Sequence, residues 1–176
     1  MYILETARLG LRDWLESDIP QFAAMCSDSR VMEFFPKILS ESEVRAMVAR
    51  LKEHIAVKGY GFWAVELKAT GEFIGFVGLE TPRFEADFTP CVEIGWRLSY
   101  KHWNKGYAQE AAGKCLEFGL EKLGISEIFA FTSVLNKRSI NVMEKIGMSY
   151  VKEFEHPAIE PGHPLRKHVL YVKRKS

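Results

Sequence analysis

The chain has 176 residues, of which 47% are hydrophobic and 27% are charged, and its formal net charge is +1. A net charge this small lacks the excess of positive charge that is typical of proteins that bind nucleic acid or anionic lipid. No hydrophobic stretch approaches the roughly 20 residues that a membrane-spanning helix needs. The cysteines Cys26, Cys91 and Cys115 are odd in number and have no Cys-x-x-Cys spacing. We therefore expect a cytoplasmic protein without a disulfide framework and without a bound metal.

The N-terminal segment has the alternation of a β-strand. In ARLGLRDWL (7–15), both leucines that flank Gly10 fall on one face, and Arg8 and Arg12 fall on the other. Ser17 or Asp18 then offers an N-cap for a first helix, because hydrophobic residues follow at helical spacing.

A second helix and a hairpin complete the first half of the chain. The stretch SESEVRAMVARLKEHI (40–55) carries a hydrophobic stripe, and Glu43 can form a capping box with Ser40. Two β-rich runs, 62–67 and 73–80, are separated by a short turn that contains glycine. This arrangement predicts an antiparallel hairpin.

The second half alternates between the two kinds of element. A long helix is expected at 107–123, with Glu110 and Lys114 as an i,i+4 pair. The other expected elements are strands at 91–99, 127–134, 148–156 and 166–175 and a short helix at 136–147. The order, with no repeat or linker, predicts a single α/β domain with a mixed sheet over residues 1–176.

The segment WNKGYAQEAA (103–112) places a glycine turn directly before a good helix. The first turn of a helix has unpaired N–H groups and a positive dipole end, which together suit a phosphate. Gly106 has no side chain to block the approach, and Lys105 adds a positive charge. This segment alone does not decide between a glycine that only forms the turn before the helix and a glycine turn that binds phosphate. Neither the P-loop pattern nor the dinucleotide glycine pattern is present.

Glu93, in CVEIGW, is a carboxylate inside an otherwise apolar strand. It can be a general base whose pKa is raised by burial, or an edge-strand carboxylate that faces water. Gly95 lies on the same face and allows a bulge or the close approach of a ligand. Further along, Asn136 and Ser139 have the spacing of an N-cap and an N3 residue, and the Ser139 hydroxyl can also reach a ligand.

Four segments in this order resemble the GNAT superfamily of N-acetyltransferases, and most closely its Rim-type (RimJ/RimL-like) branch. They are ARLGLRDWLESD, FWAVELKATGEFIGFVGL, VEIGWRLSYKHWNKGYAQEAA and NKRSINVMEKIGM. The resemblance implies one GNAT domain with a mixed, mostly antiparallel twisted α+β sheet of about seven strands flanked by about four helices. It also implies acetyl-CoA as the acetyl donor and a primary amine, on a protein N-terminus or a small molecule, as the acceptor.

The resemblance also implies where acetyl-CoA lies. Pantetheine would follow the strand that matches EIGWRL, and backbone amides of the glycine turn would hold the pyrophosphate, with a Trp where the family pattern has Arg or Gln. The implied cofactor contacts are Ile94, Trp96, Arg97, Leu98, Trp103, Asn104, Lys105, Gly106, Tyr107, Ala108, Asn136 and Ser139.

One departure from the family concerns the acid. Many relatives carry a tyrosine, seven residues after the asparagine, that protonates the departing thiolate, and this chain has Met143 there. Methionine donates no proton. We expect Ser139 to stabilise the thiolate by a hydrogen bond, Glu93 to be the base, and a backbone N–H near Gly95 to stabilise the developing oxyanion.

The acceptor is less defined than the donor. The family places acceptor loops at positions like 32–42 and 157–165, and carboxylates such as Glu33, Glu41 and Glu160 could attract a cationic amine. The histidines His156, His163 and His168 match no zinc spacing with Glu160, so we expect them to be loop and strand-end residues.

Two other functions remain open from the sequence. A non-catalytic acyl-CoA-binding module would keep the cradle and lack the chemistry, and Met143 favours it. Another nucleotide-binding α/β domain is the weaker alternative. Nothing in the sequence separates a monomer from a homodimer.

Overall fold

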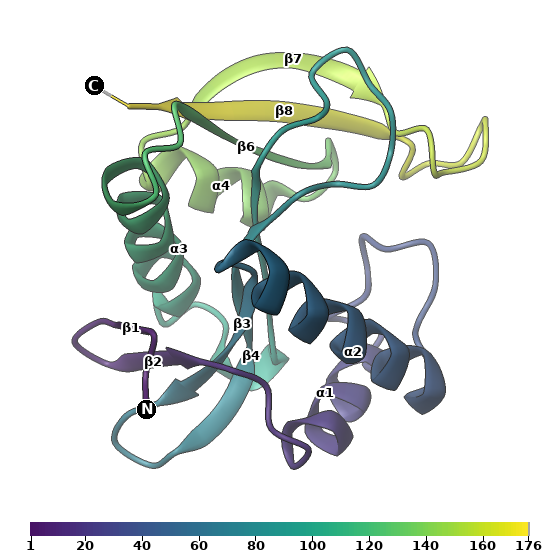
Figure 1. Ribbon diagram of the computed structural model, residues 1–176. Coiled ribbons are helices and arrows are strands. Elements are labelled where there is room, and N and C mark those ends of the chain that lie inside the picture. The colour runs from purple at the N-terminus through teal and green to yellow at the C-terminus, as the bar shows by residue number, and fades with distance from the viewer. Residues whose placement is uncertain (176) are drawn as a thin grey trace.

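The computed structural model describes residues 1–175 and shows helices on both sides of one twisted sheet (Figure 1). Two short helical turns, Tyr100–His102 and Phe118–Lys122, precede and extend one of the helices. The elements are β1 (Leu4–Glu5), β2 (Leu9–Arg12), α1 (Asp18–Ser27), α2 (Glu41–Lys58), β3 (Phe62–Leu67), β4 (Glu72–Glu80), β5 (Glu93–Leu98), α3 (Tyr107–Glu117), β6 (Glu127–Ser133), α4 (Lys137–Lys145), β7 (Ser149–Glu155) and β8 (Lys167–Arg174).

The sheet has the strand order β1-β2-β3-β4-β5-β6-β8-β7. Every neighbouring pair is antiparallel except β5 and β6, which are parallel. The predicted mixed, mostly antiparallel α+β fold is therefore confirmed. The described chain has eight strands where about seven were expected, because the two residues of β1 pair with Leu11 and Gly10 and are too short to show a periodicity of their own.

The helices form a layer on each face of the sheet. Small residues of α3, among them Ala111, Ala112 and Cys115, let that helix pack closely on the strands, and Met143 of α4 joins the same core. On the other face, α1 and α2 cover a cluster that includes Phe22, Val48, Phe62 and Phe76. The central strands of the sheet are therefore buried on both sides, whereas the edge strand β7 is largely exposed.

The helix limits follow local signals. Ser40 accepts a hydrogen bond from the backbone N–H of Glu43 at 3.3 Å, and the Glu43 carboxylate accepts one from the Ser40 N–H at 2.8 Å. The predicted capping box of α2 is thus confirmed. At α1, Ser17 makes no side-chain cap, and the Asp18 carboxylate instead accepts from the Leu15 N–H at 2.8 Å.

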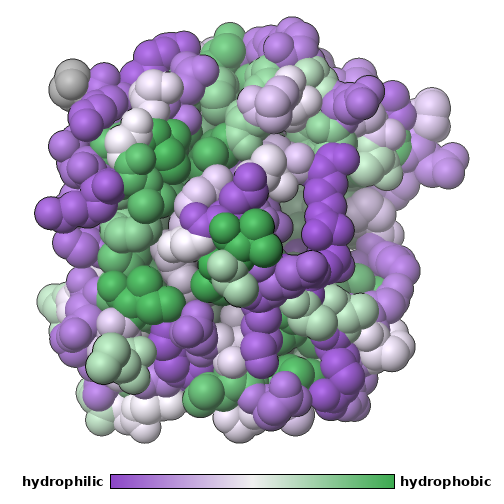
Figure 2. All heavy atoms as spheres, viewed as in Figure 1, coloured by the Kyte–Doolittle hydropathy of each residue, from purple (hydrophilic) through white to green (hydrophobic). Residues whose placement is uncertain are grey.

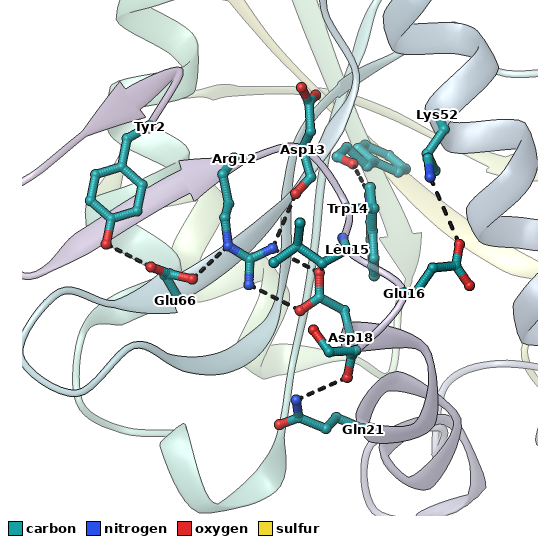
Figure 3. Close-up of polar contacts among 12 residues, drawn as sticks. Tyr2, Arg12, Asp13, Trp14, Leu15, Glu16, Asp18, Gln21, Lys52 and Glu66 are labelled. Atoms are coloured by element: carbon teal, nitrogen blue, oxygen red, sulfur yellow. Dashed lines mark hydrogen bonds and ion pairs between the residues drawn. The ribbon is translucent and has the colours of Figure 1, made fainter.

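Arg12, which the alternation places opposite the two leucines of its strand, is buried. Its side chain is only 8% exposed and forms a bidentate pair with Asp18, at 2.7 and 2.9 Å (Figure 3). Glu66 accepts from the Arg12 Nε on the other side and from the Tyr2 hydroxyl at 2.6 Å. We name Arg12, Asp18, Glu66 and Tyr2 the Arg12 cluster; it ties the start of α1 to β2 and β3.

The surface carries both hydrophilic and hydrophobic residues (Figure 2). In Figure 2, hydrophilic side chains are dispersed over the face in view, and hydrophobic residues gather mainly on the left, over α3. Within residues 1–175, none of the helices has the length and apolar character that crossing a lipid bilayer requires.

Candidate active site

The site forms where strands β5 and β6 separate. Their parallel pairing is limited to Glu93 and Phe129, and the Phe129 N–H donates to the Val92 carbonyl at 2.9 Å. Beyond that point, β5 keeps a regular antiparallel ladder with β4 up to Leu98. One edge of β5 is thus paired along its length, and the other is open.

The alternation of hydrogen bonds on β5 shows which backbone groups face the opening. The Ser99 N–H donates to the Ile74 carbonyl of β4, so the odd-numbered residues of β5 direct their backbone groups toward β4. Those of Ile94, Trp96 and Leu98 point away from β4. The Leu98 carbonyl accepts from the Trp103 indole at 2.9 Å, which leaves Trp96 with an N–H and a C=O for an extended ligand.

A cavity of about 590 Å³ occupies this opening. All of the predicted site residues except Lys105 line it. They come from four elements or turns: β5, the turn 103–106, the start of α3 and the start of α4. The members are Glu93, Ile94, Trp96, Arg97, Leu98, Trp103, Asn104, Gly106, Tyr107, Ala108, Asn136 and Ser139.

The glycine turn has the geometry of an anion cradle. Gly106 is the N-cap of α3 with φ 77°, and Asn104 also has a positive φ of 59°. The first intrahelical bond runs from the Glu110 N–H to the Gly106 carbonyl at 3.0 Å. The N–H groups of 107–109 therefore have no partner within the helix, and they lie where the cavity begins. A pyrophosphate fits this end.

Arg8, which the sequence did not single out, braces this turn from β2. Its Nη1 donates to the Lys105 carbonyl at 2.9 Å, its Nε donates to Glu110 at 2.7 Å, and its guanidinium lies 4.5 Å from the centre of the Tyr107 ring. The predicted Glu110–Lys114 pair is wrong, because Arg8 and Thr6 take the Glu110 carboxylate and Lys114 pairs with Glu117. Only the three-dimensional fold shows this contact, since Arg8 and Glu110 are 102 residues apart.

Glu93 is not an edge-strand carboxylate, because β5 lies between β4 and β6 and the side chain lines the cavity. No described side chain donates a hydrogen bond or forms an ion pair with it. Burial, and to a smaller extent the nearby Glu80 carboxylate, raises the pKa of Glu93 to about 8. Glu80 is its directly opposed partner on β4. Burial also raises the pKa of Glu80, whose carboxylate lies 3.6 Å from the His54 ring nitrogen.

Gly95 has a packing role that differs from the one expected. The register between β4 and β5 is regular at Gly95, which pairs with Gly78, so there is no bulge there. A Cβ on Gly95 would lie 2.8 Å from the Phe62 ring. The residue is small because this ring covers the strand on the side of α2.

The start of α4 presents its polar groups to the same cavity. The Asn136 side chain accepts from the Ser139 N–H at 3.2 Å, as predicted for an N-cap. Its amide nitrogen donates to the Ser139 hydroxyl oxygen at 3.1 Å and to the Thr132 hydroxyl oxygen at 3.0 Å. Asn136 thus holds the Ser139 oxygen as an acceptor, and this leaves the hydroxyl hydrogen free to be donated elsewhere. Met143, 2% exposed, is part of the core and of the cavity wall.

Both predicted acceptor loops reach the cavity. Segment 32–42 contributes Phe34 and Phe35, segment 157–165 contributes Ile159, and His156 lies directly before the second segment. Burial lowers the pKa of His156 to about 4, helped by the neighbouring His168 and Arg166, so its ring is neutral. Among residues 1–175, no group of three or more metal-binding side chains is assembled.

The carboxylates proposed to attract a cationic amine do not line the cavity. Glu33 points to Arg138 of α4, at 2.7 Å, and both side chains are half exposed. Glu41 pairs with Arg45 on α2, and Glu160 is exposed. Glu93 is the one carboxylate in the described wall of the cavity.

Residues 8–149 match the family model described as acetyltransferase (GNAT) domain. The chain belongs to the acetyltransferase (GNAT) family. It is 36% identical over 152 residues to the uncharacterized protein YkkB of Bacillus subtilis, which spans 85% of this chain and 86% of that protein. The crystal structure of a GNAT acetyltransferase from Bacillus anthracis superposes with a TM-score of 0.80 at 27% identity, over 97% of each chain.

A third similarity is one of fold. RimL, a ribosomal-protein α-N-acetyltransferase solved with coenzyme A, has a TM-score of 0.78 at 16% identity and covers 99% of this chain and 98% of its own. The predicted membership in this family is therefore confirmed, and the chain is an acetyl-CoA-dependent N-acetyltransferase. The amine that it acetylates is a separate question.

Proposed function

We propose that the enzyme transfers acetyl directly from acetyl-CoA to a primary amine, on a small molecule or at a protein N-terminus, with Glu93 as the general base. The observation that carries this proposal is the unpaired Glu93 carboxyl at the point where β5 opens. Its raised pKa, about 8, lies close to neutral pH, where a base transfers protons most effectively. Acetyl-CoA supplies the activated acetyl group.

The chain's own groups account for donor binding. The free N–H groups of 107–109 and the positive end of α3 suit the pyrophosphate, and Arg8 keeps the turn in place. The open edge of β5 offers the Trp96 C=O to an amide N–H of pantetheine. Lys105 adds charge near the cradle without lining the cavity.

The remaining groups divide the chemistry. Glu93 removes a proton from the ammonium before the attack, or from the amine as its nitrogen bonds to the thioester carbon, directly or through water, and the C–S bond then breaks to release the thiolate. The Trp96 N–H faces the opening, whereas the Gly95 N–H is directed toward β4. We therefore assign Trp96 to stabilise the negative charge that develops on the acetyl oxygen. The Ser139 hydroxyl hydrogen, left free by Asn136, stabilises the sulfur as thiolate.

Thiol release with a panel of amines tests this function. We expect release above the rate of hydrolysis with at least one class of peptide, amino acid or polyamine. Glu93→Gln should lower kcat by roughly 10²–10⁴-fold and leave the acetyl-CoA affinity unchanged. Glu80→Gln is the matched control, because it removes the carboxyl group directly opposite Glu93 on β4. This variant should retain turnover. An enzyme whose Glu93→Gln variant turns over normally from pH 6 to 9 does not use this base.

Calorimetry tests the cradle separately from the chemistry. Gly106→Glu should abolish acetyl-CoA binding, because it adds a negative charge and a side chain where phosphate would lie. Gly71→Glu is the control, since Gly71 has a similar φ of 70° and open space around its Cβ position, in a hairpin turn. Equal affinities for the wild type and both variants would refute the cradle.

A further inference from the structure

Arg97 is a buried cation without an anionic partner. Its side chain is 9% exposed and lines the cavity. Nη1 donates to the Cys26 sulfur at 3.3 Å, and Nε has no hydrogen-bond partner. Burial raises the pKa of the Cys26 thiol, so this sulfur is neutral and supplies no counter-charge. No carboxylate among the described residues forms an ion pair with Arg97.

Such an arrangement is costly unless something else satisfies it. A guanidinium stays protonated in proteins, so burial does not remove its charge. The surroundings of Arg97 are aromatic: its guanidinium carbon lies 4.1 Å from the centre of the Phe35 ring and 5.6 Å from that of Phe76. These rings offset part of the desolvation cost by cation–π attraction, and they leave the planar N–H groups for a ligand.

The side chain is on the opposite face of β5 from the donor cradle. Ile94 and Leu98 pack in the core beneath α3, whereas Arg97 lies among rings of the α1 and α2 layer. The side chains of the even-numbered residues of β5 therefore face the side of the sheet on which α3 begins. Arg97 is directed instead toward segment 32–42, through Phe35, which forms part of the cavity wall on this side.

We propose that Arg97 binds a carboxylate of the acceptor, so that the enzyme acetylates an amine that carries a carboxylate several carbons away from the nitrogen, such as an ω-amino acid. This inference rests on the proposed function. Glu93 and Arg97 are on the same face of β5, with Cα atoms about 13 Å apart, and Gly95 with the overlying Phe62 ring lies between them. The amine end lies toward Glu93, the carbon skeleton over Phe62, and the carboxylate end at Arg97.

The charge of the cavity favours this acceptor over a polyamine. Its described wall carries Arg30, Arg97, Arg138 and Lys145 against the single carboxyl of Glu93. Arg30 and Arg138 are paired with Asp28 and Glu33, so Arg97 and Lys145 are the cations of the described wall without a carboxylate partner. A polycation would meet these like charges, and such juxtaposition disfavours the wrong partner.

The test compares acids with their own amides, for example 6-aminohexanoate with 6-aminohexanamide, and includes 4-aminobutyrate as a shorter acid and spermidine as a polyamine. We expect kcat/KM for the acid to exceed that for the amide by about 100-fold in the wild type, as a buried charged pair supports. Arg97→Met should remove this preference by raising KM for the acid, and Arg97→Lys should keep part of the preference. Arg45→Met, on exposed α2 surface, should leave it unchanged.

Several results would overturn the inference. If the amide or spermidine is acetylated as well as the acid by the wild type, Arg97 does not read a carboxylate, although the proposed function stands. If Arg97→Met instead raises KM for acetyl-CoA and leaves the ratio of kcat/KM between acid and amide unchanged, Arg97 binds the donor and not the acceptor. If no amine at all supports thiol release, the proposed function fails and this inference fails with it. The wild-type comparison needs no variant, so it holds even if Arg97→Met folds poorly.

Discussion

The Arg12 cluster and the cavity face of β5 place the same chemical groups in opposite situations. Arg12 is surrounded by two carboxylates, Asp18 and Glu66, and each finds a hydrogen-bond donor. On β5, Glu93 and Arg97 likewise place a carboxyl group and a guanidinium on one face of a strand, but they lie too far apart to form an ion pair. One region pairs its buried charges, and the other holds them apart.

The difference shows in the pKa values of the two glutamates. Burial alone would raise the pKa of Glu66, but hydrogen bonds from Tyr2 and Arg12 outweigh it, and the pKa is lowered. For Glu93 nothing opposes burial, and the pKa rises to about 8. Paired charges contribute to the stability of the fold, whereas the unpaired ones are available to a ligand.

Removing the cation from the paired cluster should have the largest effect. Arg12→Met leaves Asp18 and Glu66 buried without their partner, and we expect the free energy of unfolding to fall by about 3–5 kcal/mol. Urea denaturation measures this loss, with the exposed Arg45→Met as control. A loss below about 1 kcal/mol would show that the cluster is not a paired unit in solution.

The two glutamates should respond to pH in opposite directions. The pKa of Glu93 is raised in the folded protein, so between pH 4.5, the ordinary pKa of a glutamate, and pH 8 the folded chain keeps a proton that the unfolded chain releases. The free energy of unfolding therefore falls as pH rises through this range. The advantage of Glu93→Gln over wild type should therefore grow from pH 5 to pH 8. Glu66 has a lowered pKa, so the stability it provides is present above 4.5 and is lost as pH falls through its folded pKa.

Thermal or urea unfolding across pH 4–9 checks both slopes. Glu66→Gln should be less stable than wild type near neutral pH, and the gap should close in acid. Parallel curves for the wild type and Glu93→Gln would mean that Glu93 ionises normally in the folded protein.

The smallest effect on stability is expected at Arg97. Arg97→Met orphans no carboxylate and places an apolar side chain among Phe35 and Phe76, so we expect the free energy of unfolding to change by no more than about 1 kcal/mol, in either direction. The same urea measurement as for Arg12→Met compares the two arginines directly. A loss as large as that of Arg12→Met would assign Arg97 to the structure instead of to a ligand.

Local patterns were sufficient to predict most of the fold. The capping box at Ser40, the hairpin 62–80 and the turn at Gly106 each depend on residues close in sequence, and each was found where the pattern placed it. The short β1 was missed because two residues show no period.

The charge partners could not be predicted, because they depend on long-range register. Alternation indicated that Arg12 lies on one face of its strand, but Glu66, 54 residues away, decides that this face is buried and paired. Glu80 faces Glu93 only because β4 and β5 align after a 12-residue connection, 81–92. The partner of Glu110 is likewise 102 residues distant.

The alternation of β5 has a consequence for how such an enzyme diversifies. On our proposal, even-numbered residues of the strand and its open edge face the donor, and Glu93 and Arg97, at odd positions, face the opposite side. Substitution at position 97 would then change which amine is accepted without disturbing acetyl-CoA, whereas insertion of one residue would exchange the two sets at once. One strand would in this way let the choice of acceptor vary in evolution while the donor side stays fixed.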